Sequence, residues 1–180
     1  MKFHVKQSAL AGLMAAVICI LGPWALTIPV SPVSISLGTL AIYFVVSVLG
    51  MKLGTISVMI YILLGLAGVP VFTNFTGGPG KLFGPSGGYI IGYVFLALIA
   101  GSFVDKSKTS LPIHFAGMIL GTAALYFFGT LWMAYQMDFT FTQALMAGVV
   151  PYIPGDLIKL AVAMAVGTQI RKRLTRAGLI

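Results

Sequence analysis

Long stretches without a charged side chain are the feature that most constrains this sequence. No Lys, Arg, Asp or Glu occurs in residues 7–51, 53–80, 82–104 or 109–137. A helix needs about 20 mostly apolar residues to cross the hydrocarbon core of a bilayer, and each stretch is long enough. Only 8% of the residues are charged, whereas a soluble domain carries roughly 25%. The sequence therefore predicts an all-α integral membrane protein.

Six spans are predicted, forming a single membrane-embedded domain over residues 1–180. They cover residues 8–28, 34–50, 53–69, 86–104, 111–134 and 140–170. Lys2 and Lys6 precede the first apolar run, as they would in a signal peptide, but no small-residue cleavage site follows and further spans do. The first segment is therefore expected to be a retained helix, and the buried thiol of Cys19 within it is expected to be inert.

The basic residues predict which side of the membrane each loop faces. With the N-terminus inside, nine of the eleven Lys and Arg residues fall in inside segments, while Lys81 falls in an outside loop and Lys159 in the last span. This bias follows the positive-inside rule, so both termini are expected to be cytoplasmic, in a bacterial cytoplasmic membrane. The net charge of +8 is thus attributed to topology and to contact with anionic lipid, not to nucleic acid. The cluster expected to face lipid consists of Arg171, Lys172, Arg173 and Arg176.

The last predicted span contains an acid and a base. In PYIPGDLIK (151–159), Asp156 and Lys159 are three positions apart and share one helix face. Pro151 and Pro154 are expected to stop a regular helix near Gly155, with Asp156 capping the helix that restarts. The pair is either a structural ion pair or a ligand site, in which Lys159 takes an anionic group and Asp156 takes N–H donors. Broken helices at membrane depth line cavities, which favours the ligand site.

Two segments on the expected outer side are rich in Pro and Gly. They are TIPVSPVSISLG (27–38) and, between spans three and four, PVFTNFTGGPGKLFGPSGG (70–88). The second is interpreted as a lid whose backbone amides close over a small ligand; the alternative is a floppy connection. Gly80 and Lys81 are followed by Leu82, so the segment is not a Walker A motif. No cofactor is expected, and any ATPase must be another chain.

The spacing of the histidines and acidic residues does not predict an enzyme active site or a metal site. His4 and His114 have no acidic neighbour at metal-ligand spacing. Asp105, Asp138 and Asp156 fall on different elements, so no acidic dyad can be argued. No catalytic or metal-binding residue is predicted.

Small residues recur four apart in the first predicted span. Ala11 and Ala15 form one such pair, and Gly12 and Ala16 form another. This spacing lets helices approach closely in lipid. The alternatives are packing within the bundle and a docking face for a partner membrane protein, for which Ala11 and Ala15 are the candidates.

Several motifs together resemble the BioY family. GLAGVPVF (65–72), a Gly-rich stretch, GPSGGYIIGY (84–93) and PYIPGDLIK occur in the family's order and spacing, over nearly the whole chain. Members of this family are the substrate-capture (S) components of energy-coupling-factor (ECF) biotin transporters. The resemblance implies a six-helix bundle with cytoplasmic termini and high-affinity capture of biotin as the transported ligand near the outer face. It also implies two kinds of partner, an ECF transmembrane coupling protein and ABC-type ATPase subunits.

The resemblance further implies ligand-binding residues. These are Asp156 and Lys159 as polar pocket residues, Gly84, Gly87, Gly88 and Tyr89 as pocket wall and lid hinge, and Asn74 as a lid contact. Aromatic walls for the fused rings of biotin are expected from Tyr89, Tyr93, Trp24 or Phe72. SPVSISLGTL (31–40) is similar to the family's P-V-P-I-T-L-Q-T-L, but Gly38 stands where the family has glutamine. Two other functions stay open: an S component for another small vitamin, and a stand-alone channel or structural membrane protein.

Overall fold

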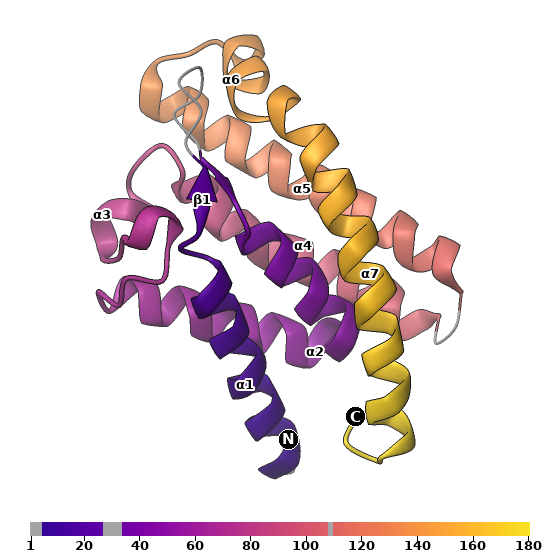
Figure 1. The fold of residues 1–180 in the computed structure, drawn as a ribbon. Helices are drawn as coiled ribbons and strands as arrows, with labels where there is room; N and C mark the ends of the chain where they lie inside the picture. The colour runs from indigo at the N-terminus through magenta and orange to yellow at the C-terminus, as the bar shows by residue number, and fades with distance from the viewer. Residues whose placement is uncertain (1–4, 27–33, 108–109) are drawn as a thin grey trace.

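The computed structural model describes residues 5–26, 34–107 and 110–180, and most of these residues are helical (Figure 1). The helices are α1 (Val5–Leu21), α2 (Gly38–Leu66), α3 (Pro79–Leu82), α4 (Gly87–Lys106), α5 (Leu111–Met137), α6 (Phe141–Gly148) and α7 (Ile153–Arg176). Two-residue strands β1 (Ala25–Leu26) and β2 (Ile35–Ser36) pair antiparallel, and η1 (Thr73–Phe75) and η2 (Val150–Tyr152) are 3-10 turns. The prediction of an all-helical protein is confirmed.

Four of these segments are long and apolar enough to cross a bilayer: α2, α4, α5 and the run from α6 through α7. The helix α1 is shorter, at 17 residues, which corresponds to a length of about 26 Å. Both chain termini lie toward one end of the molecule, and α6 and β1 lie toward the other (Figure 1). The chain is therefore a multi-pass membrane protein.

The helix α2 folds back on itself at Gly50. Gly50 has φ 77° and ψ −162°, a conformation outside the helical region. In a straight helix, residues eight apart are separated by about 12 Å along the axis, yet a Cβ atom on Gly54 would lie 3.4 Å from the Cα of Val46. The two halves of α2 therefore pack against each other as a hairpin (Figure 1). They fall within the predicted segments 34–50 and 53–69.

Polar side chains from two other helices hold this hairpin turn. The carboxylate of Asp105, at the end of α4, accepts a hydrogen bond from the backbone N–H of Met51 at 2.9 Å. Arg171 of α7 donates to the carbonyl of Val48 at 3.1 Å and to Asp105 at 2.7 Å. Because helix ends leave backbone N–H and C=O groups without partners, these contacts satisfy both sides of the turn. We refer to Asp105, Arg171 and the Val48–Met51 backbone as the hairpin clasp.

The last predicted span breaks earlier than expected. The interruption is η2, and α7 begins at Ile153, so Pro154 lies in the first turn, where a missing N–H leaves no helical bond unmade. The prediction that Asp156 caps this helix is wrong, because Tyr152 is the N-cap residue and no side chain caps it. Asp156 instead lies within the first turn of α7.

The first helix ends at Leu21, before Gly22 and Pro23, rather than near residue 28. Ala11 and Ala15 are only 2% and 1% exposed, and the hydroxyl of Ser57 in α2 donates to the carbonyl of Ala11 at 2.9 Å. Ala11 and Ala15 therefore pack within the chain, and their role as a docking face for a partner stays a prediction. The other small pair, Gly12 and Ala16, lies on the exposed face of α1.

The Gly-rich segment 70–88 is attached to the rest of the fold, contrary to the floppy alternative. The backbone N–H of Asn74 donates to the carbonyl of Pro23 at 2.9 Å, and that of Gly78 donates to Gly65 at 2.7 Å. The rings of Trp24 and Phe75 meet edge to face at 5.6 Å. In the other Pro-rich segment, residues 27–33, including Pro29 and Pro32, lie outside the described residues.

Replacing Gly50 by Ala is expected to destabilise the protein by about 2 kcal/mol, because φ is positive there and L side chains adopt such a φ only with strain. The added Cβ would also lie 1.9 Å from a carboxylate oxygen of Asp105. Thermal unfolding of the purified protein in detergent measures the change. Gly12→Ala is the matched control, because nothing lies within 4 Å of its Cβ position. Equal unfolding temperatures for the two variants would contradict the strained turn.

Candidate functional site

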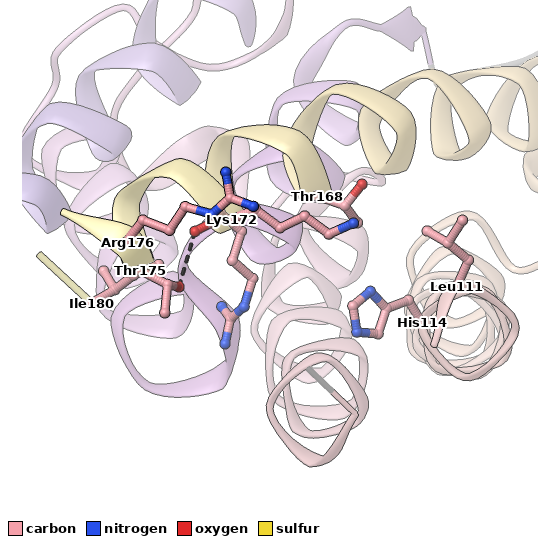
Figure 2. A pocket seen from close by; sticks show the side chains of 8 residues that line it. Leu111, His114, Thr168, Lys172, Thr175, Arg176 and Ile180 are labelled. Carbon is pink, nitrogen blue, oxygen red and sulfur yellow. Dashed lines mark hydrogen bonds between the residues drawn. The ribbon is translucent and has the colours of Figure 1, made fainter. Parts of the chain in front are cut away.

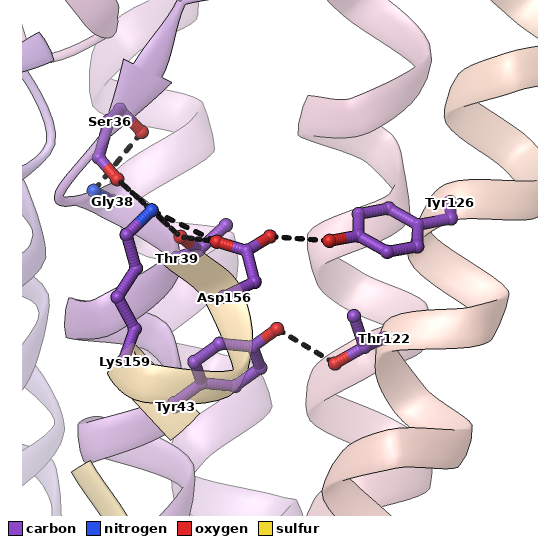
Figure 3. A network of polar contacts seen from close by, with 8 residues as sticks. All are labelled: Ser36, Gly38, Thr39, Tyr43, Thr122, Tyr126, Asp156 and Lys159. Atoms are coloured by element: carbon purple, nitrogen blue, oxygen red, sulfur yellow. Dashed lines mark hydrogen bonds and ion pairs between the residues drawn. The ribbon is translucent and has the colours of Figure 1, made fainter. Parts of the chain in front are cut away.

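A cluster of polar side chains lies where α7 faces β2, α2 and α5 (Figure 3). Asp156 and Lys159 come from α7, Thr39 from the first turn of α2, and Tyr126 from α5. The backbone carbonyl of Ser36 in β2 completes the cluster. The β2–α2 segment, α5 and α7, which are distant from one another in sequence, therefore meet at one pair of charges.

The ammonium of Lys159 uses all three of its N–H donors. They reach the carbonyl of Ser36 at 2.8 Å, the hydroxyl of Thr39 at 3.1 Å and a carboxylate oxygen of Asp156 at 2.9 Å. The Lys159 side chain is only 14% exposed. A buried ammonium without partners would be strongly destabilising, so these three hydrogen bonds offset the cost of burying it.

The carboxylate of Asp156 is also fully engaged. Its second oxygen accepts a hydrogen bond from the hydroxyl of Tyr126 at 2.7 Å, and Thr39 lies 3.2 Å from the first. The residue is 5% exposed. The pair is therefore a complete buried ion pair, with hydrogen-bond partners for both carboxylate oxygens.

Helical spacing explains why both charges face inward. Asp156, Leu160, Ala163 and Gly167 are buried along α7, at intervals of three or four residues that define one face. Ile158, between the two charges, is 67% exposed on the lipid-facing side. Because α7 restarts at Ile153, this register turns Asp156 and Lys159 toward α2 and α5.

A small cavity adjoins the pair. It measures about 40 Å³, room for only a few water molecules at about 10–15 Å³ each. Its lining is Ser34, Ser36, Thr39, Tyr89, Tyr93, Leu125, Tyr126, Gly148, Tyr152, Asp156 and Lys159. Ligand pockets usually measure about 300–1,000 Å³. The cavity is therefore much smaller than a usual ligand pocket.

A second, apolar cavity of about 190 Å³ lies beside the first, between α2, α5 and α7. Both cavities have Tyr126 and Asp156 in their lining. On the wall of the larger one, the hydroxyls of Tyr43 and Thr122 are hydrogen-bonded at 2.7 Å. The hydrogen bond between Tyr126 and Asp156 therefore lies at the boundary of a polar and an apolar cavity.

Comparison with known proteins identifies the fold that carries this cluster. The sequence model of the BioY family matches residues 1–176. The chain belongs to the BioY family. It is 35% identical over 168 residues to the biotin transporter BioY of Thermotoga maritima, covering 93% of this chain and 97% of that one. It is 31% identical to the biotin transporter BioY2 of Lactococcus lactis, covering 92% of this chain and 90% of that one.

A solved structure has the same fold as this BioY chain. It is described as the S-component for biotin from an ECF-type ABC transporter, and the two align with a TM-score of 0.86 at 33% sequence identity. The alignment covers 93% of this chain and 92% of the other. The membrane-embedded bundle described above is thus the S-component fold.

Of the ligand-binding residues predicted from the BioY resemblance, the structure brings together Asp156, Lys159 and Tyr89, which all line the small cavity. The hydroxyl of Tyr89 donates to the carbonyl of Gly148 at 3.0 Å and so ties α4 to the end of α6. Tyr93, expected as an aromatic wall, also lines the cavity. Phe72 and Trp24 do not: Phe72 packs on Tyr61, and Trp24 is 58% exposed.

The predicted glycines lie away from the small cavity. A Cβ on Gly88 would come within 2.2 Å of Trp132 Cβ, and one on Gly87 within 1.6 Å of the carbonyl of Leu82. The indole of Trp132 donates to the carbonyl of Gly84 at 3.0 Å. Gly84, Gly87 and Gly88 therefore allow the Gly-rich segment and α4 to approach α5 closely, and their part in ligand binding stays a prediction.

Asn74 reaches the edge of the site indirectly. It has φ 61°, and its amide donates to the hydroxyl of Ser34 at 3.2 Å. Ser34 lines the small cavity. The role of Asn74 as a lid contact also stays a prediction.

Sequence reasoning missed Tyr126 and Thr39. Neither is charged, and Tyr126 lies 30 residues from Asp156, its partner. The available signal was the rule that a tyrosine hydroxyl buried in a membrane bundle needs a partner. That rule predicts that the Tyr126 hydroxyl has a hydrogen-bond partner, but it does not identify the partner residue. Among the described residues, no group of three or more His, Cys, Asp or Glu could hold a metal ion.

Removing one member of the buried pair is expected to destabilise the fold more than removing both. Lys159→Met alone leaves Asp156 charged and buried, which costs about 3 kcal/mol. The double variant Asp156→Leu with Lys159→Met removes both charges, and most of that loss is expected to be recovered. Thermal unfolding of the parent, of Lys159→Met, of Asp156→Leu and of the double variant measures the coupling. If the double variant loses as much stability as the two single variants together, the two side chains do not stabilise each other.

Proposed function

We propose that this chain captures biotin and takes it up across the cytoplasmic membrane as the S component of an ECF-type transporter. The observation that carries the proposal is the match to the solved S-component for biotin, at a TM-score of 0.86 and 33% identity over 93% of this chain. The relatives named as biotin transporters support the same substrate. A transport role of this kind is not enzymatic and needs no resident cofactor.

The chemistry of the cluster suits the two ends of biotin. The carboxylate of its valerate chain requires a cation, which Lys159 supplies if it exchanges the Ser36 carbonyl or Thr39 for the ligand. The ureido group offers N–H donors and a carbonyl acceptor, which suit the Asp156 carboxylate and the Tyr126 hydroxyl. The tyrosines Tyr89 and Tyr93 supply apolar faces for the fused rings. These assignments are our proposal for the residues that bind the ligand.

We also propose six membrane spans with both termini in the cytoplasm. The hairpin at Gly50 divides α2 into two spans, and α6 together with α7 supplies the sixth. The hairpin clasp joins the turn of α2 to the basic end of α7. Lys52, Lys106 and the arginines of α7 therefore lie at one end, as the positive-inside rule requires of cytoplasmic ends. This topology puts the Asp156 cluster toward the outer side.

Energy for transport is proposed to come from partner chains. The sequence contains no Walker A motif, so ABC-type ATPase subunits, acting through an ECF transmembrane coupling protein, are expected to drive release inward. The ECF context of the matched structure supports this arrangement.

Purified protein is expected to bind biotin tightly, and Lys159→Ala is expected to weaken binding roughly tenfold or more, because a hydrogen bond to a charged group is lost. Isothermal titration calorimetry measures both affinities. Lys106→Ala, an exposed lysine at the end of α4, is the matched control and should bind as the parent does. No tight biotin binding by the parent protein would overturn the proposal, and displacement of biotin by lipoate, thiamine or riboflavin would point to another vitamin.

The double variant Asp156→Leu with Lys159→Met distinguishes a ligand-binding role of the buried pair from a purely structural role. If the pair belongs to the ligand site, this variant stays folded and loses biotin binding. If the variant binds biotin as well as the parent, the pair has a structural role only. Solute flux through the reconstituted chain without ATPase partners would favour a channel.

Docking to the coupling protein is proposed to use the exposed small residues of α1. Gly12→Leu with Ala16→Leu should abolish co-purification with the coupling protein, because bulky side chains prevent close helix approach. Biotin binding should be retained, since neither residue lines the cavities beside Asp156. Ala116→Leu, on the exposed face of α5, is the matched control. An intact complex for the α1 variant would exclude this face as the docking surface.

A further inference from the structure

A third pocket, separate from the two cavities beside Asp156, lies between the start of α5 and the end of α7 (Figure 2). Its volume is about 410 Å³. Its lining is Leu111, His114, Thr168, Arg171, Lys172, Thr175, Arg176 and Ile180. Lys172 lies sixteen residues after Asp156 on α7, or about 24 Å along the helix axis. The pocket is therefore at the end of the bundle that carries the hairpin clasp.

The described lining residues of this pocket include three cationic side chains and no acidic side chain. Arg171 is partly neutralised, because it is paired with Asp105 in the hairpin clasp. Lys172 and Arg176 form no ion pair among the described residues. They are four positions apart and project from the same face of α7 (Figure 2). Two uncompensated cations thus face one concave site.

His114 adds a polar group that packing does not explain. It is 2% exposed, and in Figure 2 its ring faces the side chains of α7 across the pocket. Its Nε2 contacts the carbonyl of Ser107, which fixes that nitrogen as the donor. Its Nδ1 is buried and has no hydrogen-bond partner among the described residues. A buried polar atom normally has one, so this nitrogen points to a missing partner.

Apolar surface extends from the pocket along both helices. Leu111 and Phe115 of α5 are 51% and 41% exposed. Leu157 of α7, which lies on the same helix face as Thr168 of the pocket, is 43% exposed. Further along the same two helices lies the apolar cavity of about 190 Å³. A molecule held here by an anionic group would therefore have hydrocarbon surface beside it.

We propose that this pocket binds a phosphate group, and that the phosphate is the headgroup of an anionic phospholipid. Lys172 and Arg176 contact the phosphate oxygens, and the unpartnered Nδ1 of His114 accepts a hydrogen bond from a headgroup hydroxyl. The acyl chains lie along the exposed apolar residues of α5 and α7. The pocket is at the basic end of the bundle, and basic pockets between transmembrane helices are suited to anionic headgroups.

The test is retention of lipid by the purified full chain. The protein is exchanged into mixed micelles of phosphatidylglycerol or of phosphatidylcholine, and bound lipid is counted by native mass spectrometry. We expect phosphatidylglycerol to be retained and phosphatidylcholine to be lost. Lys172→Gln with Arg176→Gln should weaken retention about thirtyfold, since each basic residue near an anionic headgroup contributes about a factor of five.

Arg173→Gln with Lys106→Gln is the matched control, because it removes two exposed positive charges at the same end without touching the pocket. It should retain the lipid. His114→Phe should weaken retention in the same direction as the pocket pair. Biotin binding by all variants reports that they are folded, and it is measured separately from lipid binding.

Three results would overturn the proposal. Equal lipid loss by the pocket pair and the control would show a general charge effect. Equal retention of phosphatidylcholine by the parent protein would show no anionic site. Displacement of the lipid by inorganic phosphate at equal concentration would assign the pocket to a soluble phosphate compound.

Discussion

The buried ion pair of Asp156 and Lys159 is the interaction on which the packing of β2, α2 and α5 against α7 depends. Two charges inside a membrane bundle are tolerated only when every donor and acceptor is satisfied. Here the partners come from β2, α2 and α5, so the pair determines how these elements sit against α7. At the other end of α7, Arg171 and Asp105 do the same for the turn of α2. Between the Lys159–Asp156 and Arg171–Asp105 ion pairs, α7 is held mainly by apolar contacts.

On the proposed assignment of Asp156 and Lys159 to the ligand site, the same pair explains how a compact bundle can bind a ligand. The small cavity is far below the size of a ligand pocket, because the polar side chains point at one another. A ligand that offers both an anionic group and N–H donors can replace these internal bonds one for one. The cost of opening the site is then offset by equivalent bonds to the ligand. An apolar ligand would leave two charges without partners, so the cluster also discriminates between ligands.

Several parts of the fold and the site follow from residues that are close in sequence. Apolar run length predicts the helices, and the spacing of Asp156 and Lys159 predicts their common face. The structure differs from the expectation where a local sequence pattern is compatible with more than one arrangement. Pro151 and Pro154 mark a break, but the helix restarts at Ile153, before the expected point. Ala11 and Gly12 belong to overlapping small-residue pairs, and only packing against α2 decides that Ala11 is buried and Gly12 exposed.

The sequence by itself determined that this chain crosses a membrane, that its basic residues fall outside the long uncharged stretches, and that its last apolar segment carries an unusual pair of charges. These are properties of composition and short-range spacing. The tertiary structure alone decided that Tyr126 and Thr39 complete the pair, that Gly84, Gly87 and Gly88 support the contact with Trp132, and that His114 faces the basic end of α7. Each of these contacts joins residues on different helices. Their distances depend on how the helices pack, and helical periodicity does not encode that packing.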